Sequence, residues 1–427
     1  METIATNNIE IRSWCPDIEE KAMDQMKLIS QLPFVKEICL MPDGHLGQNM
    51  CIGGVVATDN VVVPDFVGAD IGCGMCAMKT NITVDDLTED VSKKIFNQLQ
   101  RDIPVGFNRN HERDISELRS TYKDNYNEIW MDIFSKQYSA RKALETKYHP
   151  LKDRDEDYAF WIQLGTLGGG NHFLEIQKDE QGFIWIMIHS GSRNIGKLVG
   201  DFYNDMALSL NKKWYSDNGS TNIPFFPVET EEGECYLSWM EFALKFAFMN
   251  RKVMMDKTVI VFERIFGSDK FEILTDEIAD ELMINIHHNY ASLENHHGKN
   301  VWVHRKGATK ATSNTIGIIP GSMGTNSYIV NGKGNHFSLH SCSHGAGRNM
   351  GRKEFSRRMK DSYDDIQKSL DGVLHSKFGK FQYGKDKGLL DVSEAPAAYK
   401  DIDSVMENQK DLVDILVKLR PLICLKG

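Results

Sequence analysis

A histidine surrounded by small residues lies in the C-terminal half of the chain, in the run Ser341-Cys342-Ser343-His344-Gly345-Ala346-Gly347-Arg348. Because its neighbours carry almost no side chain, a large ligand can approach both the imidazole ring of His344 and the backbone N–H groups beside it. Arg348, four residues later, adds a fixed, forked cation that suits a phosphate. The run therefore indicates a nucleophile in a phosphate-binding turn.

Residue types that bind metal ions occur at the predicted ends of several short strands. Asp70 and Cys73 place a carboxylate and a thiol three residues apart in one turn. His172 follows a glycine-rich loop, His189 closes the apolar run IWIMI, and His288 closes the run LMINI. These donors together suit zinc, cobalt, iron or manganese, and the soft thiolate by itself favours zinc. They exceed what one tetrahedral zinc needs, so the pattern predicts a two-metal site bridged by the Cys73 thiolate.

A second turn of small residues lies between two apolar runs, at Pro320-Gly321-Ser322-Met323, with Ser327 close behind it. Such a turn leaves N–H groups free to bind phosphate oxygens, although a tight hairpin has the same composition. Elsewhere, Glu175 can accept hydrogen bonds from the N1–H and 2-amino groups of guanine, and Tyr399 can stack on a base. These residues predict a purine nucleotide site.

A histidine nucleophile is chemically consistent with these neighbours. Neutral imidazole attacks the α-phosphorus of a triphosphate, pyrophosphate leaves, and a labile phosphoramidate remains. A metal ion offsets the charge of the triphosphate and orients the leaving group. Metal ligands and a nucleophilic His344 in one protein therefore form a coherent prediction.

Composition limits the class of protein. The 427 residues are 41% hydrophobic and 26% charged, which is ordinary for a globular protein. The net charge of −10 disfavours a protein that coats nucleic acid by charge alone. The eight cysteines are too sparse for a disulfide scaffold and indicate reduced thiols. No run reaches the roughly 18–20 apolar residues of a membrane helix and no signal peptide is visible, so we expect a cytoplasmic protein that binds no membrane.

The chemical motifs lie in strand-like blocks separated by two helical excursions, at about 83–160 and 199–261. Short apolar runs bounded by Gly, Asp and Pro predict strands in 33–80, 161–195 and 284–348. The tail 389–419 is predicted to be helical. A domain boundary between the blocks would split the site, so we predict one large mixed α/β (α+β) domain over 1–427, with central β-sheets and peripheral helices around a metal and nucleotide cleft.

A series of segments resembles the RtcB-type RNA-splicing ligase family, and the shorter bacterial members most closely. The segments follow the order of the family from about residue 41 to residue 427, which is nearly the whole chain. They are MPDGH with IGGV, VGADIGCG, GTLGGGNHFLEI, MIHSGSRNIG, HHNY, HRKGA, IIPGSMGTNSY, CSHGAGR, AYKDID and the final LKG. The resemblance implies an RtcB-like fold.

The resemblance also implies a GTP-dependent ligase. It would join RNA ends that carry a 3′-phosphate or 2′,3′-cyclic phosphate to 5′-hydroxyl ends. GMP would pass from GTP to His344, then to the RNA 3′-phosphate, and would leave when the 5′-hydroxyl attacks. Two manganese ions bridged by Cys73 replace the zinc that thiolate softness favours.

Position by position, the resemblance assigns the following residues. The metal ligands are Asp70, Cys73, His172, His189 and His288. The nucleotide is held by Asn171, Glu175, His288, Asn289, Pro320, Gly321, Ser322, Met323, Ser327, His344, Gly345, Ala346, Gly347, Tyr399 and Lys426. Contacts to RNA or GTP phosphates are expected from Arg193, Arg348 and either Arg305 or Lys306.

Three other functions remain open at this point. A related enzyme could cap 3′-phosphate ends with GMP without sealing them. A binuclear metal phosphohydrolase needs no covalent intermediate and leaves His344 without a role. A non-enzymatic RNA-binding protein is disfavoured by the negative net charge and the complete ligand set. The sequence does not identify the natural RNA, an activating partner protein or the oligomeric state.

Overall fold

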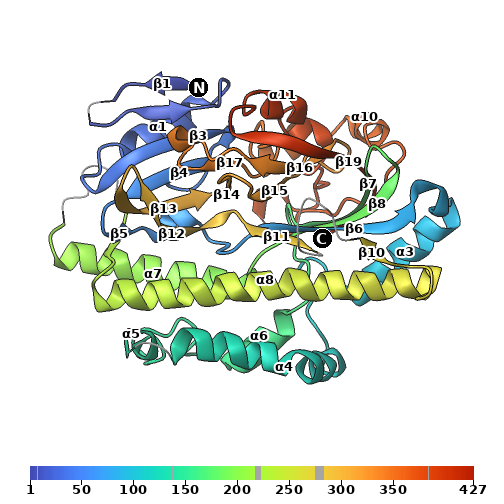
Figure 1. The fold of residues 1–427 in the computed structure, drawn as a ribbon, viewed down its shortest axis with the longest axis horizontal. Coiled ribbons are helices and arrows are strands. Elements are labelled where there is room, and N and C mark those ends of the chain that lie inside the picture. The colour runs from blue at the N-terminus through green and yellow to red at the C-terminus, as the bar shows by residue number, and fades with distance from the viewer. Residues whose placement is uncertain (7, 136–137, 217–222, 275–282, 383) are drawn as a thin grey trace.

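The computed structural model describes residues 1–427 except 7, 136–137, 217–222, 275–282 and 383. Two curved sheets form the upper part of the molecule in Figure 1, and two layers of helices lie below them. The sheets are built from segments distant in sequence, and blue N-terminal strands lie beside orange and red C-terminal strands. The predicted mixed α/β class with central sheets and peripheral helices is confirmed.

The first sheet has the strand order β1-β2-β3-β4-β13-β12. Only β2 and β3 run parallel; the other neighbours are antiparallel. The strands are β1 (Glu2–Ile4), β2 (Ile11–Ser13), β3 (Val35–His45), β4 (Ile52–Thr58), β12 (Asn289–His296) and β13 (Lys299–Lys306). β3 and β4 are buried along most of their length, so their sequences read as nearly continuous apolar runs.

The second sheet has the order β10-β6-β8-β7-β19-β16-β15, with β11 paired to β6 and β18 paired to β19. Its strands are β6 (Gly74–Thr83), β7 (Phe173–Lys178), β8 (Phe183–Ser190), β10 (Ile273–Leu274), β11 (Ile284–His287), β15 (Ile316–Ile319), β16 (Ser327–Gly332), β18 (Leu374–His375) and β19 (Val413–Lys426). Every residue of β8 after Phe183 is buried, which places this strand in the middle of the core.

Two short pairs complete the strands. They are β14 (Ala308–Lys310) with β17 (Ser341–Ser343), and β5 (Val61–Val62) with β9 (Phe226–Pro227). β17 leads directly into His344, so its pairing with β14 fixes the start of the small-residue turn.

The helices form two layers under the sheets (Figure 1). α7 (Arg193–Lys213) and α8 (Glu231–Phe266) lie directly below them, and α4 (Glu112–Phe134), α5 (Tyr138–Lys142) and α6 (Glu156–Gln163) form the outer layer. α8 has 36 residues and is therefore about 54 Å long. The other helices are α1 (Glu20–Ile29), α2 (Pro64–Val67), α3 (Glu89–Asp102), α9 (Arg352–Arg358), α10 (Tyr363–Lys368) and α11 (Ile402–Glu407).

The ends and the burial of α8 follow from its sequence. The Thr230 hydroxyl accepts a hydrogen bond from the Gly233 N–H at the start, and Gly267 with φ of 92° ends the helix. Its middle is buried on several sides, because the sheets cover one face and α4 and α5 cover another. The aromatic residues Trp239 and Phe242 pack there against α4.

Most element predictions hold, and one is wrong. The helical excursions contain α3 to α6 and then α7 and α8, as expected. The tail is not helical throughout: α11 covers only Ile402–Glu407, and β19 occupies Val413–Lys426 between β7 and β16. The β-branched and leucine-rich run in β19 fits a strand packed between two neighbours better than an amphipathic helix.

All eight cysteines are buried, and each is a thiol rather than half of a disulfide bond, as predicted. Within the described part of the chain, no helix has the length and apolar character needed to cross a membrane.

Candidate active site and metal centre

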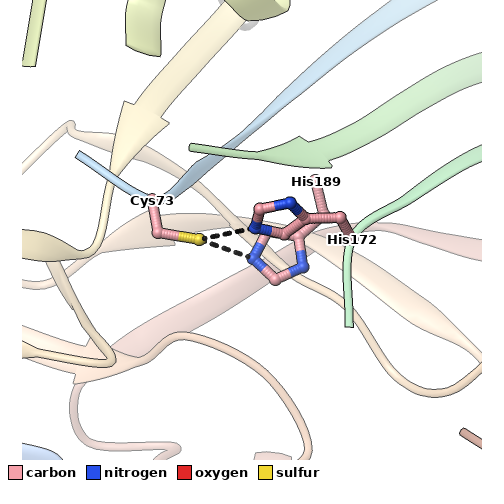
Figure 2. Close-up of side chains that lie close together, drawn as sticks. All are labelled: Cys73, His172 and His189. Atoms are coloured by element: carbon pink, nitrogen blue, oxygen red, sulfur yellow. Dashed lines mark hydrogen bonds between the residues drawn. The ribbon is translucent and has the colours of Figure 1, made fainter. Parts of the chain in front are cut away.

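The predicted metal donors converge at the ends of four strands of the second sheet, β6, β7, β8 and β11. The Sγ atom of Cys73 lies 3.3 Å from Nε2 of His189 and 3.5 Å from Nε2 of His172, as Figure 2 shows. The described residues contain one group of three donors within mutual ligand distance, and it is this one. Asp70 joins through its Oδ2, 3.1 Å from Nε2 of His172, and His288 through its Nε2, 3.4 Å from Nε2 of His189.

Each donor is positioned by the end of a strand. Cys73 directly precedes β6, and His172 directly precedes β7. His189 is the next-to-last residue of β8, and His288 lies between β11 and β12. The backbone N–H of His288 donates to the Cys73 carbonyl at 2.9 Å, which holds two donor segments together.

Backbone carbonyls orient two of the imidazoles. Nδ1 of His172 lies 3.0 Å from the Leu167 carbonyl, and Nδ1 of His189 lies 3.2 Å from the Asn171 carbonyl. Because a carbonyl only accepts, both Nδ1 atoms carry the proton and both Nε2 atoms present a lone pair. Lone pairs that face a thiol and a carboxylate at these distances form a donor set that fits a divalent cation.

Burial sets the protonation of these groups. It lowers the pKa of His189 and of His288 well below the ordinary value, and neighbouring histidines lower both further. Both imidazoles are therefore neutral, which is the form that binds metal. Burial, with the nearby Asp70 carboxylate, raises the pKa of the Cys73 thiol well above its ordinary value. A bound cation is the influence that would favour the thiolate here.

Two adjacent polar residues of α8 support the donor loops from below. The Arg251 guanidinium is fully buried and donates to the carbonyls of Gly72 at 3.0 Å and Ser190 at 2.9 Å. It also donates to Oδ1 of Asn285 at 2.7 Å. The Asn250 amide bonds the backbone of the glycine-rich loop before His172. The sequence predicted only a helix here, and the adjacent Asn250 and Arg251 inside it were the available signal.

His344 lies beside the metal donors and is held by an aspartate that sequence analysis did not identify. Nδ1 of His344 is 2.6 Å from Oδ2 of Asp43, which also accepts the N–H groups of His344 at 3.0 Å and Gly345 at 3.3 Å. Asp43 has no exposed surface. The His344 ring is 4.8 Å from the His288 ring between centroids. Asp43 therefore keeps the proton on Nδ1 and leaves the Nε2 lone pair free to attack.

Asp43 belongs to the segment MPDGH, which also contains His45. Nδ1 of His45 bonds the Asp43 carbonyl at 2.8 Å, and His45 is outside the metal donor group. The buried carboxylate in the same segment was the relevant signal.

A cavity of about 700 Å³ opens over His344. Both predicted small-residue turns line it, and so do the side chains predicted to surround a nucleotide. The predicted residues on its wall are Asn171, His189, Pro320, Gly321, Ser322, Met323, His344, Gly345, Ala346, Gly347, Tyr399 and Lys426. These residues come from distant parts of the chain, so the fold brings the predicted nucleotide site together in one place.

A buried glutamate organises the far side of this cavity. Oε2 of Glu394 accepts from Nζ of Lys426 at 2.6 Å and from the Tyr399 hydroxyl at 2.5 Å. Arg348 donates to its other oxygen at 3.3 Å. Burial opposes its ionisation, but the cations of Lys426 and Arg352 hold the pKa of Glu394 below its ordinary value. Nothing in the sequence near Glu394 indicated this role, because all of these contacts except that to Tyr399 are distant in the chain.

Several predicted nucleotide residues lie behind the cavity wall. Glu175 is buried and accepts a hydrogen bond from the Gln177 amide at 2.6 Å, and burial raises the pKa of Glu175 to about 7. The Ser327 hydroxyl accepts from the Gly321 N–H at 3.2 Å. Asn289 donates to the Asp70 carbonyl and accepts from the Gly307 N–H, so it supports the metal turn.

Two of the expected phosphate contacts are wrong. Arg305 is fully buried in β13 and pairs with both oxygens of Glu294, at 2.6 and 3.1 Å. Lys306 donates to two backbone carbonyls, those of Gln48 and Asp65. Neither cation is free for a phosphate. Arg348 lines the cavity over His344, and Arg193 lines a neighbouring one.

Comparison with known proteins finds relatives along almost the whole chain. The family model described as tRNA-splicing ligase RtcB matches residues 25–427. RNA-splicing ligase RtcB of Escherichia coli (strain K12) is 35% identical over 100% of this chain and 99% of its own length. A tRNA-splicing ligase RtcB of Nanoarchaeum equitans is 30% identical, with 98% of this chain and 96% of its own length covered. RNA-splicing ligase RtcB homolog 1 of Entamoeba histolytica is 30% identical over 93% of this chain and 82% of its own.

These matches define an enzyme of the ligase class, and its fold places a metal-donor cluster beside a histidine. The chain belongs to the RtcB family of RNA-splicing ligases.

Proposed function

We propose that this protein is a GTP- and manganese-dependent RNA ligase. It joins RNA ends bearing a 3′-phosphate or a 2′,3′-cyclic phosphate to 5′-hydroxyl ends. The single observation that carries the proposal is the position of His344, whose ring is oriented by Asp43 and lies beside the metal donors in the wall of a cavity. A nucleophile, a metal centre and a nucleotide pocket are the parts that nucleotidyl transfer requires.

The metal would be held by the converging donors already described. They are Asp70, Cys73, His172, His189 and His288. The bound metal offsets the charge of the triphosphate and of the departing pyrophosphate. The donor types alone would favour zinc over manganese because of the thiolate, so the choice of manganese and of two ions rests on the family.

GTP would occupy the cavity over His344. The turns at 320–323 and 344–347 line it, and Lys426 and Tyr399 close the other side. The N–H groups of Gly321, Ser322, His344 and Gly345 already bond protein side chains, so backbone contacts to the phosphates would come from Met323, Ala346 and Gly347. Glu175 would accept hydrogen bonds from the N1–H and 2-amino groups of guanine. The guanine N–H groups would then take the place of the Gln177 amide as donors to the buried Glu175 carboxylate.

The chemistry of the chain's own residues follows from the His344–Asp43 pair. Nε2 of His344 attacks the α-phosphorus, pyrophosphate leaves, and the imidazole becomes positively charged. The Asp43 carboxylate stabilises that charge through the Nδ1–H bond. The RNA 3′-phosphate then takes GMP from Nε2, and the 5′-hydroxyl displaces GMP to form the new phosphodiester bond.

The eight cysteines form no disulfide bonds, which fits a reducing compartment, and we place the enzyme in the cytoplasm.

Ligation itself is the test. Two RNA oligomers, one with a 3′-phosphate and one with a 5′-hydroxyl, are incubated with the protein, GTP and manganese. We expect a joined product that requires all three. An accumulating 3′-GMP-capped RNA without sealing would instead establish the capping activity. Release of inorganic phosphate without GTP would establish the phosphohydrolase.

A further inference from the structure

A second cavity, of about 890 Å³, lies beside the nucleotide cavity and shares with it Met323, Arg352 and Lys426. Its walls are the loop between α3 and α4, the glycine-rich loop before His172, the start of α7 and the segment after β18. We propose that this second cavity, here called the basic groove, binds single-stranded RNA leading into the site, with the ring of Phe107 stacked on a base. The proposal rests on the proposed ligase function.

Positive charge is concentrated in the basic groove, although the whole chain carries a net charge of −10. The lining cations are Arg109, Arg154, Arg193, Lys197, Arg352, Lys377, Lys380 and Lys426, and the lining carboxylate side chains are Asp391 and Glu394. A local excess of this kind on an acidic protein is what phosphate binding requires.

Part of that charge has no protein partner. Arg109, Arg154, Lys377 and Lys380 are exposed. No carboxylate in the described ranges forms an ion pair with any of the four; Lys197, in contrast, pairs with Asp201. These side chains are free to neutralise phosphates, and they come from separate wall segments, so a bound strand could contact several of them.

Phe107 is the unusual residue of the basic groove, because its side chain is 93% exposed. A single exposed aromatic residue is ordinary on a protein surface. Phe107, however, lies among cations, two residues from Arg109, where an apolar partner surface would be poorly matched. Stacking of a base on an aromatic ring next to phosphate-binding cations is the general mode of single-strand binding.

The loop that carries Phe107 is fastened to the active site. The Gly106 N–H donates to the Gly168 carbonyl at 2.7 Å, and Arg193 donates to the Gly106 carbonyl at 3.2 Å and to the Thr166 hydroxyl at 3.1 Å. Gly168 and Thr166 belong to the loop that precedes the metal donor His172. A base stacked on Phe107 would therefore be held at a fixed position relative to the metal centre.

The test measures binding separately from catalysis. A fluorescent RNA oligomer with hydroxyl groups at both ends, without GTP or metal, is titrated with the protein and its anisotropy is followed at several salt concentrations. Phe107→Ala is expected to weaken binding about tenfold, and Phe107→Trp to restore it. Lys377→Gln with Lys380→Gln is expected to reduce the slope of log affinity against log salt by about 1.4, about 0.7 for each lost phosphate contact.

The far end of α7 supplies matched controls. Tyr215 is also 93% exposed, and Lys212 and Lys213 lie beside it, about 24 Å along the helix from Lys197. Tyr215→Ala and Lys212→Gln with Lys213→Gln are expected to leave affinity and slope unchanged.

The proposal would be overturned if Phe107→Ala bound RNA as tightly as the unmodified protein, or if Phe107→Trp failed to restore the affinity lost in Phe107→Ala. It would also be overturned if the Tyr215 and Lys212/Lys213 variants weakened binding as much as the groove variants. Labelling of the unmodified protein with GTP is measured in parallel. Its absence would overturn the ligase function, whereas the binding comparison would still decide whether the basic groove takes RNA.

Discussion

The pair formed by Asp43 and His344 is the centre of the proposed chemistry. Asp43 has three hydrogen-bond donors on one oxygen, namely the imidazole Nδ1–H and two backbone N–H groups. It therefore fixes both the tautomer of the ring and the shape of the turn. Asp43→Asn should slow labelling of the protein by GTP by about 10²–10⁴-fold, because an amide can stabilise the wrong tautomer. Metal content should be unchanged, and a labelling rate equal to that of the unmodified protein would refute the role of Asp43.

Cys73 is the donor that contacts two of the histidines. Cys73→Ser should reduce both bound manganese and labelling by GTP, because a hydroxyl is a poorer bridging ligand than a thiolate. Metal content is measured by elemental analysis after equilibrium dialysis. Cys76→Ser is the matched control: that thiol is also fully buried but is not in the metal donor group, so its metal content should stay normal. Full occupancy in Cys73→Ser would exclude the bridge.

The raised pKa of Glu175 predicts that GTP affinity and folding stability depend on pH. Its pKa is raised by burial to about 7, and only the ionised form accepts both guanine N–H groups. GTP affinity should therefore fall as the pH drops through about 7. The stability of the folded state has the opposite trend. It falls as the pH rises from the ordinary pKa of a glutamate to about 7, because the carboxyl ionises in the unfolded chain before it does so in the buried site. Glu175→Gln should abolish both trends, as GTP titrations and thermal unfolding across this pH range would reveal; persistence of the affinity trend would assign it to another group.

Most of the proposed metal donors and the proposed nucleophile could be predicted from the sequence, because they lie in turns next to glycine or asparagine or, like His189, at the end of an apolar run. The supporting residues could not. Asp43 contacts His344, and Glu394 contacts Lys426, Arg348 and Arg352, only after distant segments have folded together. Side chains that act on other side chains leave little trace in local sequence patterns.

At the scale of elements, α8 does more than cover the sheets. Through Arg251 it bonds the carbonyls of Gly72 and Ser190, which flank Cys73 and His189. Arg251→Leu removes the guanidinium donor from both buried carbonyls and should lower the free energy of unfolding by about 3 kcal/mol. Manganese affinity should fall as well, because the donor loops lose their support.

The neighbouring residue provides the control for that prediction. Lys252 is exposed and pairs with Asp256 one turn away, so Lys252→Ala should change stability by less than about 0.5 kcal/mol. Chemical denaturation and a metal titration measure the two effects. Equal behaviour of the two variants would mean that Arg251 only fills space.

Periodicity identified the long helices but misassigned the last strand. α7 has an apolar face over many turns and α8 is apolar on several sides along its middle, whereas the position of β19 depends on pairing with β7, β16 and β18. A strand inserted last into the middle of a sheet depends on partners distant in sequence. The helical prediction for 389–419 failed for that reason.

At the scale of the whole molecule, the site exists only because distant segments meet. Cys73 precedes β6, His189 ends β8, His344 follows β17 and Lys426 ends β19. The two sheets lie above α8 (Figure 1), and His189, His344 and Lys426 from these distant strands line one cavity. The extent of the predicted single domain, 1–427, agrees with this arrangement and remains a prediction.

The transfer of GMP to His344 is tested most directly by incubating the purified protein with α-labelled GTP and manganese and resolving it on a denaturing gel. We predict a covalent label that is lost on acid treatment, as expected for a P–N bond, and that is absent from His344→Ala although this variant retains its metal. A protein that binds manganese but takes up no label, or a label that survives in His344→Ala, would contradict the assignment of His344 as the nucleophile.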